Sequence, residues 1–264
     1  MDTPNTNFSA LLKDAITQPG SIMSAYSAFH DFSLGNQLLA LFQCQLRGLE
    51  LGPLNTFPRW EELGRHVKRG EKALTLCMPI TVKRSRSDDD GDDDSEGKAT
   101  IFVHKRRWFV ISQTEGQELE LPTMPTWNAQ QALLALDITQ VSFTSPDGNC
   151  QGYATCKREI AINPVAQLPH KTFFHECAHV LLHTADGDFT DTQQTPKNLR
   201  EIEAEAVALL CCEALGLEGS AFCRGYIQGW ANGEPIPEQS AKKILGVADK
   251  ILKAGTITKQ PTIH

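Results

Sequence analysis

The chain has 264 residues, of which 41% are hydrophobic and 22% are charged, and its formal net charge is −7. A chain of this length and apolar content can bury one large core or the cores of two modest domains. No apolar run approaches the roughly 18 to 20 residues that cross a bilayer, and the first residues lack the regions of a signal peptide. These features exclude a membrane protein, and we expect a soluble globular protein in the cytoplasm.

The first predicted element is a helix over residues 24–48. Leu34, Leu38 and Leu41 recur at the spacing that puts side chains on one helical face, and Gly48 is a typical stop signal. Residues 73–84 and 100–113 are rich in β-branched and aromatic side chains, which predicts two strands. The acidic run Asp88–Glu96 joins them, so we expect a long antiparallel hairpin.

A domain boundary is predicted within residues 116–126, where two prolines and a glycine interrupt any periodicity. We therefore expect an N-terminal domain over residues 1–118, made of a helix and the antiparallel hairpin. The C-terminal domain then covers residues 119–264.

Charge is distributed unevenly between the two parts of the chain. Residues 1–112 have 14 basic and 14 acidic side chains, but seven of the acids lie in the run Asp88–Glu96. Without that run the N-terminal part carries +7, whereas residues 113–264 have 11 basic and 18 acidic side chains, which gives −7. The two parts are therefore expected to have different partners.

The C-terminal part alternates helices and short strands, which predicts an α+β fold. A helix is expected to begin near Asn128, and strands are expected at residues 140–145 and 158–163. Further helices are predicted over residues 170–187, 197–215, 219–230 and 237–254. Cys177, Cys211 and Cys212 lie inside predicted helices and no C-x-x-C pair occurs, so we expect buried free thiols rather than disulfides.

The run TFFHECAHVLLH, residues 172–183, is the most informative motif. On a helix, His175 and His179 are one turn apart on the same face, so their imidazoles can converge on one ion. Glu176 is rotated by about 100° from His175, where it can accept a proton from water activated by that ion. A chance match in a core helix is the alternative, but unpaired polar groups would each cost several kcal/mol on burial. The motif predicts a Zn2+ site of the zinc-peptidase type with Glu176 as the catalytic base.

A catalytic zinc ion needs a third protein ligand, and His183 is a poor candidate. Its Cα lies about 12 Å along the axis from that of His175, so it is expected behind the ligands or at the surface. The longer motif with a third histidine also fails, because Leu182 and Ala185 occupy the positions of its glycine and histidine.

The predicted helix NLREIEAEAVALLCCEALGL, residues 198–217, is the best source of the third ligand. Glu201 and Glu205 share a face, so we expect Glu201 to bind the metal and Glu205 to orient a histidine, or the two to exchange these roles. Glu203 points nearly the opposite way and is expected to be solvated. All three could instead simply favour the positive end of the helix. Other possible ligands are the aspartates of the connecting loop, Asp186, Asp188 and Asp191.

Together these motifs resemble the ArdC-like antirestriction proteins. HECAH and EIEAE, residues 175–179 and 201–205, are similar to the metallopeptidase motifs of that family, and the resemblance implies a zincin-like C-terminal domain with Glu201 as the third ligand. Three further blocks resemble the family's single-stranded-DNA-binding domain: FHDFSLGNQLLALFQC, FPRWEELGRHVKRGEKALTLCMPI and WFVISQTEG. The resemblance implies that the protein protects incoming plasmid or phage DNA from restriction. The acidic run is not expected of the family.

Basic and aromatic residues in the N-terminal part also favour a nucleic-acid partner. Basic side chains can follow phosphates while aromatic rings stack on unpaired bases, so such a surface prefers single-stranded DNA. Alternatively, the aromatic residues are simply core. The candidate DNA-binding residues from this pattern are Arg59, Trp60, Arg65, Lys68, Arg69, Lys72, Lys105, Arg107 and Trp108. The resemblance adds Asn36 of the first block, which either caps structure or contacts DNA.

The acidic run suggests a further hypothesis, in which it folds over the basic surface and competes with phosphate. For the whole protein we consider two functions, a zinc metallopeptidase tethered to single-stranded DNA and a non-proteolytic DNA-binding protein with a zinc scaffold. Either could engage a protein substrate or a restriction enzyme as a partner. A DNA mimic fits poorly, because only one short run is densely acidic.

Overall fold

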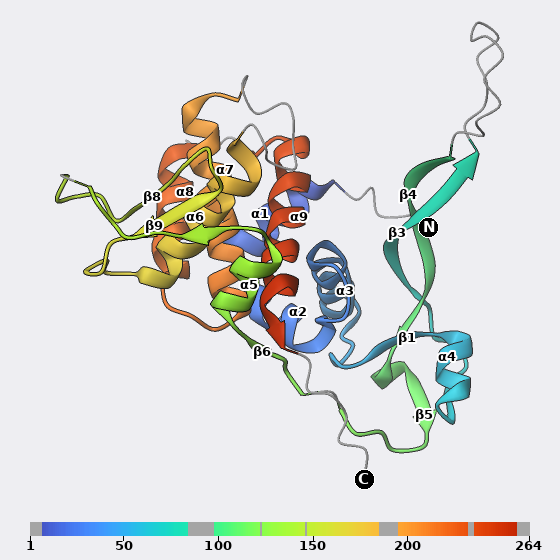
Figure 1. Cartoon of the computed structure of the whole chain (residues 1–264). Helices are drawn as coiled ribbons and strands as arrows, with labels where there is room; N and C mark the ends of the chain where they lie inside the picture. The colour runs from blue at the N-terminus through green and yellow to red at the C-terminus, as the bar shows by residue number, and fades with distance from the viewer. Residues whose placement is uncertain are drawn as a thin grey trace, which may run out of the picture. The chain divides into compact units, whose positions relative to one another are not determined.

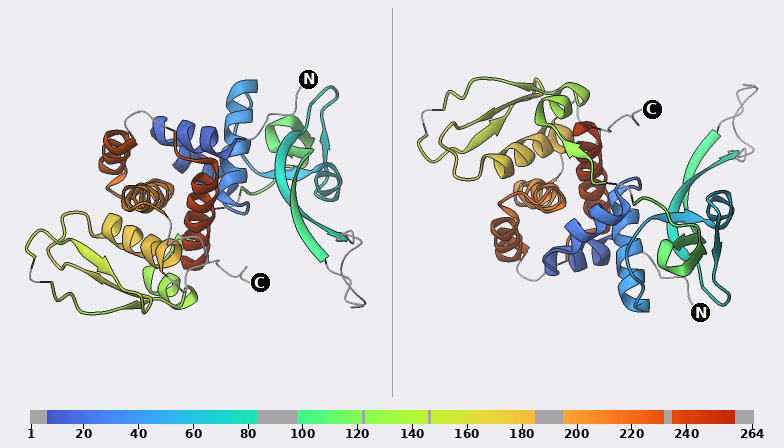
Figure 2. Two further views of the ribbon diagram at one scale, coloured as in Figure 1. Left: turned by 90° about the horizontal axis from the view of Figure 1, so that it is seen from above. Right: turned by 90° about the horizontal axis from the view of Figure 1, so that it is seen from below.

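The chain folds into two compact units, which we call unit 1 and unit 2 (Figures 1 and 2). Unit 1 combines Met1–Leu41 with Pro122–His264, and unit 2 is Phe42–Leu121. The computed structural model describes residues 7–83, 98–121, 123–145, 147–184, 195–231 and 235–257.

Unit 1 is built around helix α7, Lys197–Ala214, in which every side chain from Ile202 to Ala214 is buried. A helix that is buried on all sides must be surrounded by other elements. Helix α7 packs against α2, α6, α8 and α9. The bounds of these four helices are Ser21–Phe29, Pro169–His183, Ser220–Ala231 and Glu238–Gly255.

Helices α1 (Phe8–Thr17) and α2 belong to unit 1, so the compact unit 2 begins at Phe42, whereas we expected an N-terminal domain over residues 1–118. The physical reason is that their apolar faces complete the core of the C-terminal helices, because α1 packs on α9 and α2 on α7. Polar contacts add to this packing. Arg224 Nε donates to the carbonyl of Ile16 at 2.7 Å, and Gly20 N donates to Glu213 Oε1 at 2.8 Å.

The single helix expected over residues 24–48 is in fact two helices. Helix α2 ends at Phe29, and α3 covers Leu34–Arg47. The start of α3 is held by a distant residue, because Leu34 N donates to Asp249 Oδ1 of α9 at 2.9 Å. A hydrogen-bond acceptor at this point satisfies one of the free N–H groups that every helix start exposes.

A small sheet in unit 1 lies against α6. Its strands are β7 (Thr139–Gln140), β8 (Gly152–Ala154) and β9 (Glu159–Ile162), in the order β7-β9-β8. The central strand β9 is parallel to β7 and antiparallel to β8. Because β8 is last in this order, it is an edge strand of the three described strands. Only the first residue of the strand expected over 140–145 is in a strand. Helix α6 packs on both β8 and β9.

The remaining elements of unit 1 are short. Helix α5, Ala129–Ala135, begins after Asn128, whose side chain accepts from Gln131 N as an N-cap. Strands β6 (Thr126–Trp127) and β10 (Thr256–Ile257) form an antiparallel pair.

Unit 2 contains the predicted antiparallel hairpin, formed by β3 (Leu74–Lys83) and β4 (Lys98–Val110). Strand β1 (Leu54–Thr56) adds to the other side of β4, which gives the order β1-β4-β3. The acidic run Asp88–Glu96 lies outside the described residues. The other elements of unit 2 are α4 (Phe57–Glu62), β2 (Arg65–Val67), the 3-10 turn η1 (Ile111–Gln113) and β5 (Thr114–Gly116), which pairs with β2.

The observed elements confirm an α+β fold, in which helices accompany antiparallel strand pairs. All eight cysteines lie among the described residues and all are free, as expected, and five of them are buried. Within the described parts of the chain, no helix is both long enough and apolar enough to cross a membrane.

Candidate metal centre

Helices α6 and α7 bring together three side chains with the donor atoms of a metal site. The two imidazoles come from α6, where His175 Nε2 and His179 Nε2 are 3.0 Å apart. Glu201 of α7 places Oε2 at 3.4 Å from the first nitrogen and 3.6 Å from the second. Two donors bound tetrahedrally at about 2.0–2.1 Å from one ion are themselves roughly 3.3 Å apart, so this triangle has the size that a divalent ion requires.

The alternative assignment of Glu201 and Glu205 is decided by which imidazole nitrogen each carboxylate faces. Glu205 Oε2 lies 3.0 Å from His175 Nδ1, on the side of the ring away from the donor triangle. The same oxygen forms an ion pair with Lys171 Nζ at 2.9 Å, and the Glu205 side chain is 1% exposed. Glu201 therefore lies with the two Nε2 atoms, and Glu205 lies on the Nδ1 side of the His175 ring, the position of a residue that orients a ligand.

The carboxylates around His175 shift the pKa values of the site in a way that favours a bound cation. Burial lowers the pKa of His175, but the hydrogen bonds to Glu201 and Glu205 outweigh it and raise the pKa to about 9. The pKa of Glu201 is held far below its usual range, first by its hydrogen bonds to the two histidines. The site thus combines a carboxylate that stays ionised with an imidazole, that of His175, whose proton a metal ion can replace.

Glu176 lies beside the triangle rather than in it, in a hollow of about 560 Å3. Burial raises the pKa of Glu176, although the neighbouring histidines oppose this shift. The hollow is also lined by residues 152–156, which include the edge strand β8. A Cβ at Gly152 would lie 3.3 Å from Glu176 Cγ and 2.6 Å from Thr172 Cγ2, so only glycine lets the strand come this close to α6.

Glu203 was expected to be solvated, and that prediction was wrong. Its side chain is 2% exposed, and Oε2 lies 2.8 Å from His183 Nε2. The opposite face of α7 is not a solvent face, because this helix is buried on all sides. The side chain of His183 is 5% exposed, and its Nδ1 lies 2.9 Å from His179 Nδ1. The alternative ligands Asp186, Asp188 and Asp191 lie outside the described residues.

Among the predicted DNA-binding residues, Trp60 must be corrected. Its side chain is 0% exposed, and Nε1 donates to the carbonyl of Phe109 at 2.8 Å, so it is a core residue and cannot stack on a base. Arg65 is also occupied, since its guanidinium donates to the hydroxyl and carbonyl of Thr114 and to the carbonyl of Gln117. Tertiary packing of unit 2 therefore uses two of the residues that the sequence assigned to DNA.

Most of the other predicted DNA-binding residues lie at the surface of unit 2. Arg59 is exposed but paired with Glu62 at 2.8 Å, and Lys68 Nζ donates to the carbonyl of Ser112. Trp108 is half-buried. Asn36 is half-buried on α3 and belongs to unit 1 rather than to unit 2. The remaining predicted residues are cationic and exposed: Arg69, Lys72, Lys105 and Arg107.

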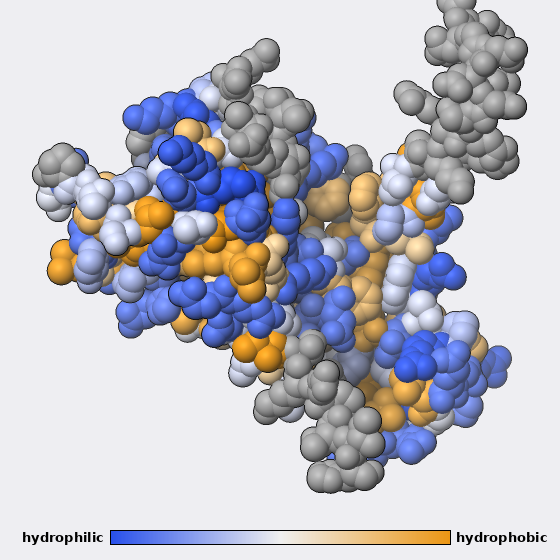
Figure 3. Space-filling view, in the orientation of Figure 1, coloured by the Kyte–Doolittle hydropathy of each residue, from blue (hydrophilic) through white to orange (hydrophobic). Residues whose placement is uncertain are grey.

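Sequence reasoning missed Phe102 as a candidate base-stacking residue. It lies on β4 opposite Pro79 and is 71% exposed, and its neighbour Ile101 is 43% exposed. Figure 3 shows apolar and hydrophilic surface mixed along the β3–β4 ribbon. The alternation of side chains along the predicted strand indicated only that some aromatic residues face outward. The sequence could not identify which aromatic residue is exposed.

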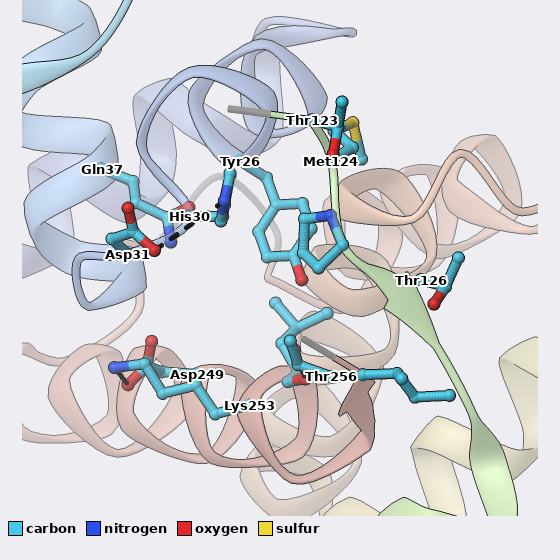
Figure 4. Close-up of a pocket in the computed structure, with 13 residues that line it drawn as sticks. Tyr26, His30, Asp31, Gln37, Thr123, Met124, Thr126, Asp249, Lys253 and Thr256 are labelled. Carbon is cyan, nitrogen blue, oxygen red and sulfur yellow. Dashed lines mark hydrogen bonds and ion pairs between the residues drawn. The ribbon is translucent and has the colours of Figure 1, made fainter. Parts of the chain in front are cut away.

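A second hollow in unit 1, of about 460 Å3, is lined by residues of α2, α3 and α9 and of the 123–126 segment (Figure 4). Its carboxylate Asp249 already accepts from Leu34 N and from Lys253 Nζ. Among the described residues, only the α6–α7 site groups three or more possible metal ligands. The chemically equipped site of unit 1 is therefore the triangle on α6 and α7.

Comparisons with known proteins agree with this architecture. Residues 12–109 match the family model described as the N-terminal domain of anti-restriction factor ArdC. The metal-free crystal structure of the antirestriction ArdC protein from plasmid R388 is similar with a TM-score of 0.53 and 16% identity, covering 95% of each chain. Its Mn(II)-bound structure is similar with a TM-score of 0.54 and 16% identity, covering 97% of this chain and 98% of that one.

A search of curated proteins found no match. Because the R388 protein is only 16% identical, its structures establish the fold alone. The family match covers the N-terminal part, and the shared fold extends over nearly the whole chain. The chain therefore matches the N-terminal domain of ArdC over residues 12–109 and shares the fold of the R388 ArdC protein over nearly its whole length.

Proposed function

We propose that this protein is an antirestriction protein in which unit 1 is a divalent-metal peptidase and unit 2 binds single-stranded DNA. The observation that carries the first part is the donor triangle of His175, His179 and Glu201, with the buried carboxyl of Glu176 beside it. The antirestriction role is taken from the family to which the N-terminal domain belongs. Protein substrate, metal and DNA are therefore the three partners to test.

The donor set fits Zn2+, because two imidazoles and one carboxylate are the ligands of a known class of zinc peptidases. Zinc also binds more tightly than manganese to most sites with nitrogen and oxygen ligands. The R388 protein has been crystallised with Mn(II), so manganese is the competing metal. When bound, such an ion lowers the pKa of water and polarises a carbonyl group.

The chain's own residues supply the proton transfers and the alignment of the substrate. Glu176 accepts a proton from the attacking water and passes it to the leaving amine as the peptide C–N bond breaks. A pKa raised by burial suits this role, because the carboxyl group can hold the proton between the two steps. Among the described strands β8 is at the edge of its sheet and borders the same hollow, so an extended peptide can be aligned there as an added strand.

The proposed DNA surface consists of the exposed cationic residues of unit 2 together with Phe102. Lys105 and Arg107 lie on β4, the same strand as Phe102, so charge and an exposed ring occur on one element. Lysine and arginine attract phosphates without sequence preference, and an exposed aromatic ring can stack on an unpaired base. Single-stranded DNA is therefore the expected partner rather than duplex.

The decisive test replaces the proposed base and measures protection of DNA in cells. Glu176→Gln keeps the shape of the side chain but cannot accept the proton, so cleavage is expected to fall by about 10²- to 10⁴-fold. The measurement is the transformation efficiency of unmethylated plasmid in a restricting host, together with mass spectrometry of the restriction enzyme's subunits. Glu218→Gln, an exposed acid of unit 1, is the matched control.

The two outcomes distinguish the proposed peptidase from its alternative. If Glu176→Gln loses protection while it still binds metal and DNA, the peptidase is responsible for protection. If protection survives, the protein protects by binding alone, and the metal site is a scaffold. Metal analysis of the purified protein shows separately whether zinc or manganese is present.

A further inference from the structure

The two histidines of the donor triangle are supported in different ways. His175 Nδ1 meets the carboxylate of Glu205 directly, at 3.0 Å. His179 Nδ1 instead meets a second ring, because His183 Nδ1 lies 2.9 Å away. His183 in turn reaches a carboxylate, with its Nε2 at 2.8 Å from Glu203 Oε2. Three side chains from α6 and α7 thus form a chain that ends at a donor atom of the metal site.

With neutral imidazoles, the hydrogen bonds of this chain fix where each proton lies. A metal ion at the triangle requires a bare Nε2 on His179, so the proton of that ring is on Nδ1. It donates to His183 Nδ1, which must then be bare, and His183 therefore carries its own proton on Nε2. That proton is donated to Glu203 Oε2. One arrangement of protons satisfies all contacts, and it leaves the lone pair of His179 directed at the triangle.

The burial of His183 and Glu203 costs free energy, which argues against a role that is only structural. The side chains of His183 and Glu203 are 5% and 2% exposed, and Glu203 Oε1 has no hydrogen-bond partner within the described parts of the chain. Replacing such a buried polar pair by apolar side chains is often neutral or stabilising.

We infer that His183 and Glu203 are positioning residues that orient the His179 ring and make its Nε2 a stronger donor for the metal. This inference rests on the proposed metal site and deepens it, because it assigns one histidine a carboxylate that acts through a second ring. Partners of this kind typically contribute 10- to 100-fold to metal affinity. Neither residue belongs to the donor triangle.

The main test removes both residues at once, so that no charge is left buried without a partner. In His183→Leu/Glu203→Leu, the affinity for Zn2+ and for Mn2+, measured by competition with a chelator, is expected to fall by about 10- to 100-fold. The unfolding midpoint of the metal-free variant is expected to be no lower than that of the wild type. The matched control is His170→Leu, which removes an exposed histidine from the first turn of α6 and should leave the affinity unchanged.

A second variant and a spectroscopic readout keep the test decisive if the double variant folds poorly. Glu203→Gln keeps the volume but removes the charge, and it should weaken metal binding in the same direction. In nitrogen-15 NMR of the zinc-loaded wild type, His179 should show a slowly exchanging Nδ1 proton that is lost in His183→Leu. Metal affinity within twofold of the wild type in both Glu203 variants would overturn the inference alone. A wild-type protein that binds neither metal would remove the proposed function and the inference together.

Discussion

The two units use their charged side chains in opposite ways. In unit 1 the carboxylates of Glu176, Glu203 and Glu205 are buried, and each lies beside a histidine or a lysine. In unit 2 the cationic groups of Lys105 and Arg107 lie at the surface. Burying an ion costs several kcal/mol unless it is paired, so such a group indicates a requirement for fixed geometry. The attraction exerted by surface charges is weakened by salt. Such an attraction is suited to binding a charged polymer irrespective of its sequence.

The largest expected effect is the loss of metal binding on removal of Glu201. Glu201→Ala deletes one corner of the donor triangle, so metal affinity should fall by more than the roughly 100-fold that an orienting residue contributes. Single-stranded-DNA affinity should not change, because the substitution lies in unit 1. Chelator competition and fluorescence anisotropy measure the two affinities. Loss of DNA binding in Glu201→Ala would contradict the assignment of metal binding to unit 1 and of DNA binding to unit 2.

The converse variant is Phe102→Ala in unit 2. Loss of a base-stacking ring should weaken single-stranded-DNA binding by about 1–3 kcal/mol, or roughly 5- to 150-fold, while metal affinity is unchanged. The control is Leu134→Ala, which removes an apolar side chain of unit 1 that is 85% exposed. Equal DNA affinity in Phe102→Ala and the wild type would remove this ring from the proposed surface.

Gly152→Ala tests the close approach of β8 to α6. The new Cβ would lie 2.6 Å from Thr172 Cγ2 and 2.9 Å from the carbonyl of Ala161, so strand or helix must shift. Such overpacking typically costs about 1–3 kcal/mol, measurable as a lower free energy of unfolding in urea. Gly148→Ala is the matched control, since a Cβ there meets nothing within 4 Å. A Gly152→Ala protein as stable as this control would mean that the strand adjusts freely.

The smallest effect is expected for single surface charges. Lys105→Ala and Arg107→Ala should each reduce the salt dependence of single-stranded-DNA binding by about 0.7 in the slope of log K against log salt. Titrations between 50 and 200 mM salt measure this slope, and Lys157→Ala, an exposed lysine of unit 1, serves as control. An unchanged slope in both Lys105→Ala and Arg107→Ala would mean that the DNA contacts lie elsewhere.

The sequence was most informative where a strong local pattern carries chemistry. The spacing of His175 and His179 and the shared face of Glu201 and Glu205 follow from helical geometry, and the structure brings these side chains together. Helix α6 was expected over residues 170–187 and covers Pro169–His183. Each of these expectations needed only the helical repeat and a knowledge of metal ligands.

The failures occurred where a distant residue decides the outcome. Nothing near Leu34 indicates that Asp249, 215 positions away, holds the start of α3. Trp60 lies among basic residues in the sequence, but its indole donates to Phe109 inside unit 2. Glu203 is on the predicted face of its helix, but that face meets His183 rather than solvent. In each case the local pattern was read correctly and a long-range contact decided the environment.

Unit 1 is made of two separate segments of the chain, and this affects the order in which the two units fold during synthesis. Residues 42–121 are contiguous, so unit 2 can fold as soon as they emerge. Helices α1 and α2 are made first but have to wait for α9 and α7, which are made more than 160 residues later, before their apolar faces are covered. The proposed metal centre on α6 and α7 is therefore completed after unit 2, so the part proposed to bind DNA folds before the part proposed to cleave proteins.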